Sequence, residues 1–223
     1  MTFPAMIFSA GFGTRMGPLT KDMPKPMVPL AGRPMIDYAV DLLRDAGVRQ
    51  IVANTHYLPS KIEPHLSALD IEAIREDPEI LDTGGGLKAA LPLFDEDIVV
   101  TLNPDAAWLG PNPIKRLIQA WRPEMQALLL LVPMVDASTT RTTGDFSLEQ
   151  GEIRRIGEFM YTGAQIIRTT GMGQITDKAF SLNVYWDLLA KSAPLNGVVY
   201  EGQWCDIGSA DGLATAERLL GHV

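Results

Sequence analysis

The sequence has only one cysteine, Cys205, so no disulfide can form within the chain. Secreted domains that depend on disulfides carry several cysteines, and a single one is typical of the reducing cytoplasm. Long apolar runs are missing too: residues 127–135 contain Pro133 and fall far short of the roughly 20 residues that cross a bilayer. The first residues also lack the basic and apolar regions of a secretion signal. We therefore expect a cytoplasmic protein with no membrane partner.

Positive charge is scarce in this chain. Lysine and arginine total 19 against 27 acidic residues, which gives a formal net charge of -8. A chain this acidic repels nucleic acids and anionic membranes, and its sequence shows no basic stripe. We therefore expect no nucleic-acid partner, and we expect any phosphate ligand to be met by a few positive groups gathered locally.

The rest of the composition is that of a folded α/β domain, with 46% hydrophobic and 21% charged residues in 223. In the first half, apolar runs of strand length alternate with helical patterns, which favours a parallel sheet covered by helices on both faces. The strands are expected at 5–10, 48–54, 71–74 and 97–102, and the helices at 33–46, 60–66 and 87–91, the last after the glycine triplet 84–86.

The second half of the chain has shorter and less regular elements. They are expected to be helices at 113–121 and 210–220, strands at 127–132 and 162–168, and short β segments at 146–148 and 153–159. No repeat, low-complexity tract or long linker separates the halves, so residues 1–223 are expected to form one domain.

Polar residues stand at the ends of three predicted strands. Right-handed crossovers would bring Ser9, Asn54 and Asn103 to one edge of the sheet. Ligands of open α/β sheets bind outside the carboxyl ends of the strands. The sequence therefore predicts a ligand site at this edge.

The first strand runs into a turn with two glycines, Ala10-Gly11-Phe12-Gly13-Thr14, followed by Arg15. Glycine lets the backbone approach a phosphate and point its amide groups inward. The segment matches neither a complete P-loop nor the full dinucleotide-binding pattern. Taken alone, a tight turn between strand and helix explains these glycines equally well.

A second cation, Lys25, stands between Pro24 and Pro26. The fixed φ angles of the prolines stiffen the backbone that presents the charge. An acidic chain that places a cation in a rigid apolar loop is expected to use it for binding. The alternative is a surface lysine in a proline-rich connection.

Two isolated aspartates are candidates for a metal site. Asp105 follows the strand at 97–102, and Asp206 lies in an apolar segment that ends at Gly208. Carboxylates near buried strands need a cation or hydrogen bonds, and Mg²⁺ prefers hard oxygen ligands and keeps substrate phosphates in its shell. A turn or helix-capping role is the alternative for each aspartate. No His/Cys cluster supports zinc.

These segments together resemble the sugar-phosphate nucleotidylyltransferases, and most of all the N-acetylmuramate 1-phosphate uridylyltransferases of bacterial cell-wall recycling. The resemblance covers most of the chain, is dense in the first half and is thin between residues 123 and 196. It is carried by residues 11–20, Pro24-Lys25-Pro26-Met27, Ala31-Gly32-Arg33-Pro34-Met35-Ile36, Leu81-Asp82-Thr83-Gly84-Gly85-Gly86, Gly144-Asp145-Phe146 and Trp204-Cys205-Asp206-Ile207-Gly208.

The resemblance implies a Rossmann-like (GT-A-like) fold: a mostly parallel mixed sheet flanked by helices in a single domain. Its first half, about residues 1–110, would bind the nucleotide, and about 111–223 would bind the sugar. The implied reaction joins a nucleoside triphosphate and a sugar 1-phosphate into a nucleotide-sugar and releases pyrophosphate. Because the chain ends soon after Asp206, it is expected to lack the hexapeptide-repeat domain of some relatives.

The resemblance also implies residue roles. Arg15 and Lys25 are the catalytic candidates, Arg15 on the departing pyrophosphate and Lys25 on the reacting phosphate. Asp105 and Asp206 are the candidates for holding Mg²⁺. The nucleotide-binding candidates are Ala10, Gly11, Gly13, Thr14, Gly84, Gly85 and Asn103.

One residue departs from the family pattern: Pro104 replaces the glycine of the family's Asn-Gly-Asp motif. Proline removes an amide donor, so any backbone contact that the family makes there would be lost. For the sugar, the candidates are Asp145, Thr162, Gly163 and Asn183, although Asp145 fits the start of a turn and Gly163 a strand bulge equally well. The polar segment 136–145 is a candidate flap over the sugar or an ordinary surface loop.

The favoured interpretation is a Mg²⁺-dependent enzyme that uses UTP and N-acetylmuramate 1-phosphate. Alternatives are the same chemistry on another sugar 1-phosphate or on phosphocholine, and a non-catalytic nucleotide-sugar sensor, for which Pro104 is the suggestive feature. The sequence predicts no particular oligomeric state.

Overall fold

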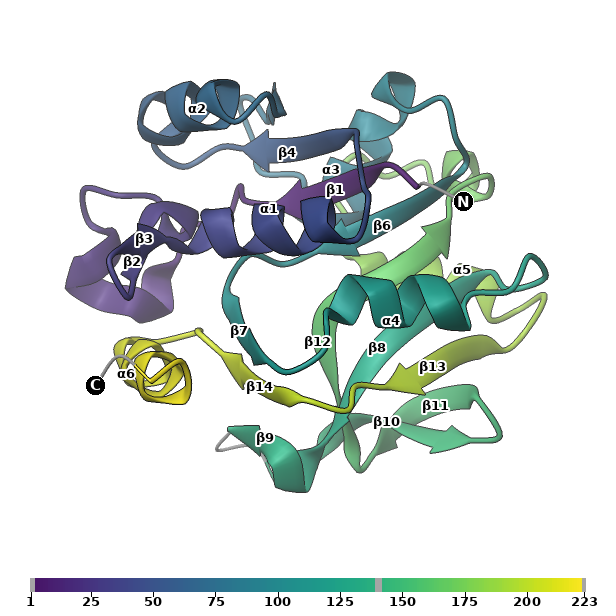
Figure 1. The fold of residues 1–223 in the computed structure, drawn as a ribbon. Helices are drawn as coiled ribbons and strands as arrows, with labels where there is room; N and C mark the ends of the chain where they lie inside the picture. Colours follow the sequence, from purple (N-terminus) through teal and green to yellow (C-terminus); the bar gives the residue numbers. More distant parts are fainter. Residues whose placement is uncertain (1–2, 139–141, 222–223) are drawn as a thin grey trace.

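The computed structural model describes residues 3–138 and 142–221, which form one α/β domain around a nine-stranded mixed sheet (Figure 1). Helices α1 and α4 cover one face of this sheet, and α3 and α5 cover the other. The six helices are α1 (Met35–Asp45), α2 (Pro59–Ala68), α3 (Asp82–Ala90), α4 (Pro113–Ala120), α5 (Leu182–Leu189) and α6 (Ala210–Leu219). Within the described ranges, no helix is both long and apolar enough to cross a bilayer.

The large sheet has the strand order β10-β11-β13-β8-β12-β6-β1-β4-β5. It is mostly parallel, because only β11 and β12 run against the direction of the other strands. The strands are β1 (Ala5–Phe8), β4 (Ile51–Thr55), β5 (Glu72–Arg75), β6 (Ile98–Leu102), β8 (Ala127–Pro133), β10 (Gly144–Glu149), β11 (Glu152–Gly157), β12 (Phe159–Arg168) and β13 (Leu195–Val199).

Two small sheets lie beside the large one. Three short strands pair in the order β7-β14-β9, and β2 and β3, with two residues each, form a hairpin. Their bounds are β2 (Pro29–Leu30), β3 (Arg33–Pro34), β7 (Ala106–Leu109), β9 (Ala137–Ser138) and β14 (Gln203–Asp206).

The strand ends predicted to form one edge of the sheet lie together. Strands β1, β4 and β6 are parallel neighbours, and Phe8 at the end of β1 is in register with Asn54. The amide of Ser9 donates to Asn54 Oδ1 at 2.7 Å, which ties the ends of β1 and β4 together. The prediction that these strand ends share one edge is confirmed.

The sequence patterns miss several elements and misplace one. Strands β7 and β14 have four residues each and lie outside the large sheet, so no long apolar run marks them. The glycine triplet lies inside α3 rather than before it. Glycine is a poor helix former, but contacts with the rest of the fold override propensity when, as here, all three glycines are buried.

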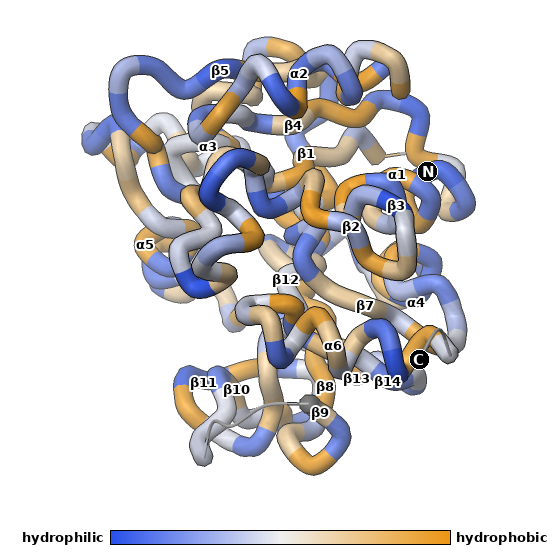
Figure 2. Tube along the Cα trace, turned by 90° about the vertical axis from the view of Figure 1, so that its left-hand side faces the viewer, coloured by the Kyte–Doolittle hydropathy of each residue, from blue (hydrophilic) through white to orange (hydrophobic). Residues whose placement is uncertain are grey.

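Apolar side chains form a core on each face of the sheet. Helix α1 buries Ile36, Ala39, Val40 and Leu43, which recur at helical spacing, against one face. On the other face, Leu87 and Ala90 of α3 pack with the apolar residues of α5. Figure 2 shows apolar colour along β1, β7 and β8 and polar colour on outer segments such as β5.

A buried polar network supports the ligand edge. The carboxylate of Glu76, only 3% exposed, accepts hydrogen bonds from Asn54 Nδ2 and from the amide of Leu81, each at 2.7 Å. Asn54 in turn holds the amide of Ser9. Glu76 therefore links the end of β1 to the segment that leads into α3.

We predict that Glu76→Ala lowers the free energy of unfolding by about 1–3 kcal/mol, because it leaves buried donors without a partner. Urea denaturation followed by circular dichroism measures this change. Glu79→Ala, at an exposed position of the same segment, is the matched control and should change the stability little. Equal effects of the two substitutions would contradict a structural role for the network.

Candidate active site

The glycine turn packs directly on Lys25. Gly13 has a φ of 64°, in the left-handed region that favours glycine, and its carbonyl accepts from the Met16 amide at 2.9 Å and from Thr20 Oγ1 at 3.0 Å. A Cβ added at Gly13 would lie 2.8 Å from Lys25 Cβ. Thr14 begins a 3-10 helix, and the exposed Gly11 would place an added Cβ in open space. The turn from Ala10 to Thr14 and the lysine therefore form one unit.

Lys25 forms an ion pair with Asp105. Its Nζ donates to Asp105 Oδ2, and the two side chains are 11% and 24% exposed. Lys25 opens a short 3-10 helix after the extended Pro24, so the loop holds the ammonium group in a fixed direction. The structure brings together two of the predicted residues, which are 80 positions apart in the sequence.

The second aspartate lies next to the first. Strands β7 and β14 are antiparallel, Asp206 is in register with Ala106, and the amide of Ile207 donates to the carbonyl of Asp105 at 2.8 Å. The two predicted metal ligands therefore occupy neighbouring backbone positions.

Arg15 completes this cluster of charges through Gly208. A Cβ added at Gly208 would lie 2.7 Å from Asp206 Oδ2 and 2.8 Å from Arg15 Nη1. The carboxylate and the guanidinium therefore both lie against the space that this glycine leaves open. The two predicted cations and the two predicted carboxylates share one site.

The donor set of this cluster fits a magnesium ion. Asp105 and Asp206 offer hard carboxylate oxygens, and Mg²⁺ is commonly held by one or two carboxylates together with waters and substrate phosphates. Residues 3–138 and 142–221 contain no group of three or more His, Cys, Asp or Glu residues with metal-site geometry. An ion bound here therefore takes its remaining ligands from water and substrate.

A cavity of about 300 Å³ lies at the same edge of the sheet. Three predicted residues line it: Asn103, Asp145 and Asn183. Asp145 is the second residue of β10 rather than the start of a turn, and its Oδ2 accepts from the amide of Tyr161 at 2.9 Å. Asn183 lies in the first turn of α5. The remaining lining residues are Phe8, Asp82, Thr83, Phe146, Arg155, Tyr161, Ser181, Leu182 and Trp186.

Gly84 and Gly85, two of the nucleotide-binding candidates, pack against the segment 178–180. Both amides donate to the carbonyl of Phe180, at 2.8 and 3.0 Å. An added Cβ would lie 2.4 Å from the Phe180 ring at Gly84 and 2.4 Å from the Lys178 carbonyl at Gly85. These glycines let α3 approach the segment 178–180, and their amide groups are not available to a nucleotide. Asp82 and Thr83, at the start of the same helix, line the cavity instead.

Thr162 and Gly163 contribute to the site indirectly. The hydroxyl of Thr162, which is 2% exposed, donates to the Leu130 carbonyl at 2.8 Å, so it does not reach the cavity. Gly163 has a φ of 83° at an irregularity in the β12–β8 pairing, which is the strand-bulge alternative. Its carbonyl accepts from the Asn103 amide at 2.9 Å, and an added Cβ would lie 2.8 Å from Asn103 Cβ. Gly163 therefore makes room for Asn103.

The aromatic wall of the cavity is not among the features predicted from the sequence. Trp186 donates from Nε1 to Gln165 Oε1 at 2.9 Å, and its ring packs edge-on against Phe146 and Tyr161. Burial raises the pKa of the Tyr161 phenol, which therefore stays protonated and cannot act as a base near neutral pH. Apolar residues in these strands and helices predict core packing, and nothing in their spacing distinguishes a cavity wall from a core.

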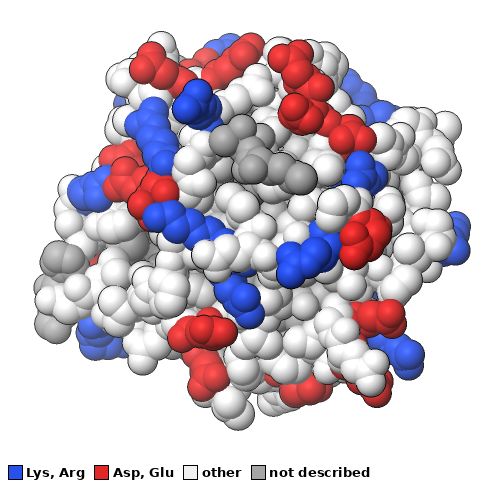
Figure 3. Space-filling view, turned by 45° about the vertical axis from the view of Figure 1, so that its right-hand side comes forward, with Lys and Arg blue, Asp and Glu red and all other residues white. Residues whose placement is uncertain are grey.

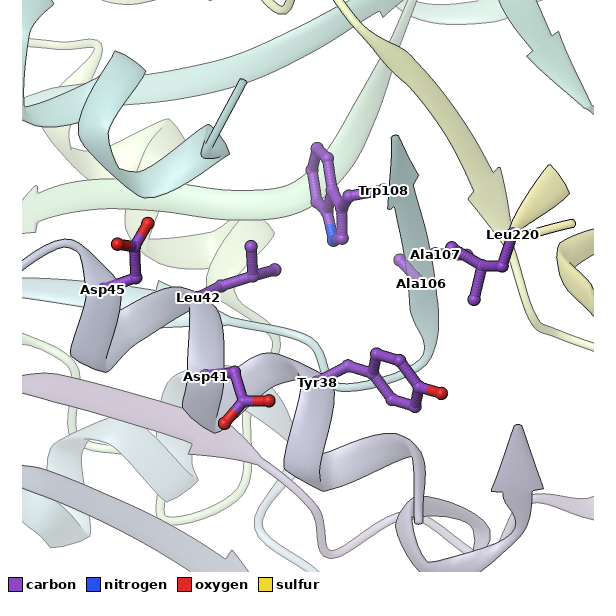
Figure 4. A pocket seen from close by; sticks show the side chains of 8 residues that line it. All are labelled: Tyr38, Asp41, Leu42, Asp45, Ala106, Ala107, Trp108 and Leu220. Carbon is purple, nitrogen blue, oxygen red and sulfur yellow. The ribbon is translucent and has the colours of Figure 1, made fainter. Parts of the chain in front are cut away.

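A second cavity, of about 270 Å³, lies between α1, β7 and Leu220 (Figure 4). Leu42 and Trp108 point toward its interior, and Asp41 and Asp45 lie on its α1 side. None of the site residues predicted from the sequence lines it. One of its lining residues, Ala106, directly follows Asp105 of the charge cluster in the sequence.

The predicted flap at 136–145 falls partly outside the described residues, since 139–141 are not among them. Before this gap, Ala137 of β9 pairs with Trp204 of β14. After it, Gly144 and Asp145 begin β10. The described ends of the segment therefore adjoin the two strands that carry Asp206 and Asp145.

On the face drawn in Figure 3, lysine and arginine side chains lie interspersed with aspartate and glutamate rather than gathered into one basic area.

Comparisons with known proteins identify relatives. The MobA-like NTP transferase domain family matches residues 5–138. The chain is 34% identical to the N-acetylmuramate alpha-1-phosphate uridylyltransferase of Caulobacter vibrioides, over 97% of this chain and 96% of that protein. It is 28% identical to the enzyme of the same name from Neisseria meningitidis, over 97% and 98%.

Solved structures show the same fold. HddC from Yersinia pseudotuberculosis, complexed with GMP-PN, has a TM-score of 0.80 at 21% identity and covers 98% of this chain and 100% of its own. The inositol-1-phosphate CTP transferase from T. maritima has a TM-score of 0.83 at 16% identity, with 99% and 96% covered. These likenesses confirm the expected GT-A-like architecture. With the match over residues 5–138 and the relative at 34% identity, they show that the chain belongs to the MobA-like NTP transferase family of nucleotidyltransferases.

Proposed function

We propose that the protein transfers a nucleotidyl group, Mg²⁺-dependently, from UTP to N-acetylmuramate 1-phosphate. The observation that carries this proposal is the gathering of Lys25, Asp105, Arg15 and Asp206 beside the glycine turn. The names of the two uridylyltransferase relatives support the choice of base and sugar. The single cysteine and the family resemblance of the sequence support a cytoplasmic role in cell-wall recycling.

The chemistry needs positioning and charge rather than a protein base. A sugar 1-phosphate is already an anionic nucleophile near neutral pH, and its phosphate oxygen attacks the α-phosphorus of the triphosphate. A new phosphorus–oxygen bond forms as the bond to the β-phosphate breaks, and pyrophosphate leaves with the electron pair. The barrier arises from repulsion between two anions and from the charge on the leaving group.

Each charged residue has a part in lowering that barrier. Lys25 contacts oxygens around the reacting phosphorus, and Arg15 neutralises the departing pyrophosphate. Asp105 and Asp206 hold the magnesium ion, which when bound supplies further positive charge to the phosphates. The amides of Ala10, Gly11, Gly13 and Thr14 lie along the nucleotide phosphates.

The cavity beside this cluster receives the sugar. Asp145 and Asn183 offer polar groups to its hydroxyls, and Asn103 stands between the cavity and Asp105. In this arrangement, residues from about 1–110 supply the nucleotide site and residues from about 111–223 supply most of the sugar site. Another sugar 1-phosphate, or phosphocholine, is the alternative acceptor for the same chemistry.

A pyrophosphate-release assay tests the function. The purified protein is incubated with Mg²⁺ and each of the common nucleoside triphosphates, paired with a panel of sugar 1-phosphates and phosphocholine. We expect the largest kcat/KM for UTP with N-acetylmuramate 1-phosphate. Tight binding of a nucleotide-sugar with no turnover of any substrate pair would overturn the proposed enzymatic function and favour a non-catalytic sensor.

We predict that Lys25→Ala keeps the fold but lowers the rate of pyrophosphate release on the order of 10²-fold or more, because a charge at the reacting phosphate is lost. Circular dichroism checks the fold, and steady-state kinetics check the rate. Lys61→Ala, at an exposed position of α2, is the matched control and should react normally. Full turnover by the Lys25 variant would remove that residue from the mechanism.

Asp206→Ala should likewise keep the fold and lose pyrophosphate release, because one of the two proposed metal ligands is removed. Isothermal titration of Mg²⁺ with UTP should show weaker metal-dependent binding of the triphosphate by this variant. EDTA should abolish turnover by the unaltered protein, and added Mg²⁺ should restore it. Turnover that persists in EDTA would contradict the metal site.

Gly208→Ala tests the packing of the charge cluster. The added methyl group would meet both Asp206 and Arg15 at under 3 Å, so one of them must move. A misplacement of this size is expected to lower kcat on the order of 10²-fold. Gly173→Ala, where the added carbon would meet no atom within 4 Å, is the control and should keep its activity.

A further inference from the structure

Arg155 is a cation on the wall of the sugar cavity with no part in the phosphate chemistry above. Among the described residues that line this cavity it is the only lysine, arginine or histidine; the other charged ones are Asp82 and Asp145. Lys25 and Arg15, the cations assigned to the phosphates, do not line it. The cavity therefore contains a positive charge that the transfer of a nucleotide does not require.

The guanidinium of Arg155 is held in a fixed place by two aromatic rings. Its central carbon lies 5.3 Å from the ring centre of Phe146 and 5.3 Å from that of Trp186. Trp186 is itself fixed by its hydrogen bond to Gln165. Contact with aromatic faces favours the cation, and the side chain stays 41% exposed, so its free donors are accessible to a ligand.

Hydrogen bonds fix the orientation of the same group. Nη1 donates to Asn183 Oδ1 at 2.5 Å, and Nη2 donates to the Asn183 carbonyl at 3.3 Å and to Asp187 Oδ1 at 3.0 Å. These bonds to described residues engage three of the five N–H groups that a guanidinium carries. The others remain for a ligand, and little side-chain entropy is lost when it binds.

The ion pair between Arg155 and Asp187 lies at the surface, where the side chains are 41% and 69% exposed, and exposed ion pairs contribute little. Asp187 does not line the cavity, whereas Asp82 and Asp145 do. Asp145 accepts a hydrogen bond from the amide of Tyr161. An anion that enters the cavity therefore meets a preoriented guanidinium that still has N–H donors to offer to a carboxylate.

On the basis of the proposed function, we propose that Arg155 determines sugar specificity by binding a carboxylate of the sugar 1-phosphate. N-acetylmuramate is N-acetylglucosamine with a lactyl ether, and the carboxylate of that ether is the only charge by which the two sugars differ. Arg155 thereby selects an acidic sugar over its neutral parent.

The test compares kcat/KM for N-acetylmuramate 1-phosphate and N-acetylglucosamine 1-phosphate, each with UTP and Mg²⁺. Arg155→Ala should lower kcat/KM for the muramate substrate by about 10- to 100-fold, the value of a hydrogen-bonded ion pair, and change the neutral substrate little. Arg155→Lys keeps the positive charge but not the planar guanidinium. Its kcat/KM for the muramate substrate should lie between the values of Arg155→Ala and of the unaltered protein. Thermal unfolding monitors the fold of each variant.

Arg154→Ala is the matched control. Arg154 is in register with Ser147 and Arg155 with Phe146, so the two side chains point to opposite faces of β11, and Arg154 does not line the cavity. This control should keep the substrate preference of the unaltered protein. An equal loss on both substrates in Arg155→Ala, or no preference for the muramate substrate in the unaltered protein, would overturn the specificity role.

Failure of the proposed function gives a different result. If the unaltered protein releases pyrophosphate with neither sugar phosphate, calorimetry with N-acetylmuramic acid and with N-acetylglucosamine tests the arginine directly. Tighter binding of the acid by the unaltered protein, lost in Arg155→Ala, supports the carboxylate site although the reaction is not the one proposed. Equal binding of the two sugars by the unaltered protein would overturn the carboxylate site at Arg155.

Discussion

The arrangement of the site depends on the compensation of half-buried negative charge in an acidic chain. Asp105, just before β7, lies beside the end of β14, which carries Asp206, and two carboxylates so placed repel each other unless cations lie close by. Lys25 pairs with Asp105, and Arg15 lies against the same glycine as Asp206. Both cations come from loops after β1, so the compensation brings the N-terminal loops against the segments that carry the two aspartates.

Small residues give these charges the room to approach one another. Gly13 lets the first loop contact the aliphatic part of Lys25, and Gly208 leaves a space against which both Asp206 and Arg15 lie. A methyl group at Gly13 would displace the stem of Lys25, and one at Gly208 would displace Asp206 or Arg15, so either would change the distances that set the strength of the charge interactions. Gly13 and Gly208 therefore influence the electrostatics of the site because they set the distances between its groups. Gly84 and Gly85 of α3 instead allow this helix to pack against residues 178–180.

The sequence predicts the charge cluster better than the cavity, for a physical reason. A glycine pair, a lysine between prolines and isolated aspartates are unfavourable in a strand or loop without a partner, so each suggests a binding role from the sequence alone. Arg154 and Arg155 are chemically identical, and only the register of β10 with β11 decides which of them faces the cavity. The packing of Gly84 and Gly85 is not predictable either, because their partner, Phe180, is almost a hundred residues away.

Residues 103–105 link the cavity to the charge cluster, and this position gives Pro104 a structural role. Asn103 lines the cavity proposed for the sugar and donates its amide to Gly163, while Asp105, two residues on, pairs with Lys25. The family pattern has a glycine between them, and glycine would leave this connection flexible. Proline fixes its φ and is buried here, so the backbone itself holds the distance between the cavity wall and the carboxylate proposed to bind the metal. The loss of one amide donor is thus accompanied by a stiffer link between the groups proposed to position sugar and phosphate.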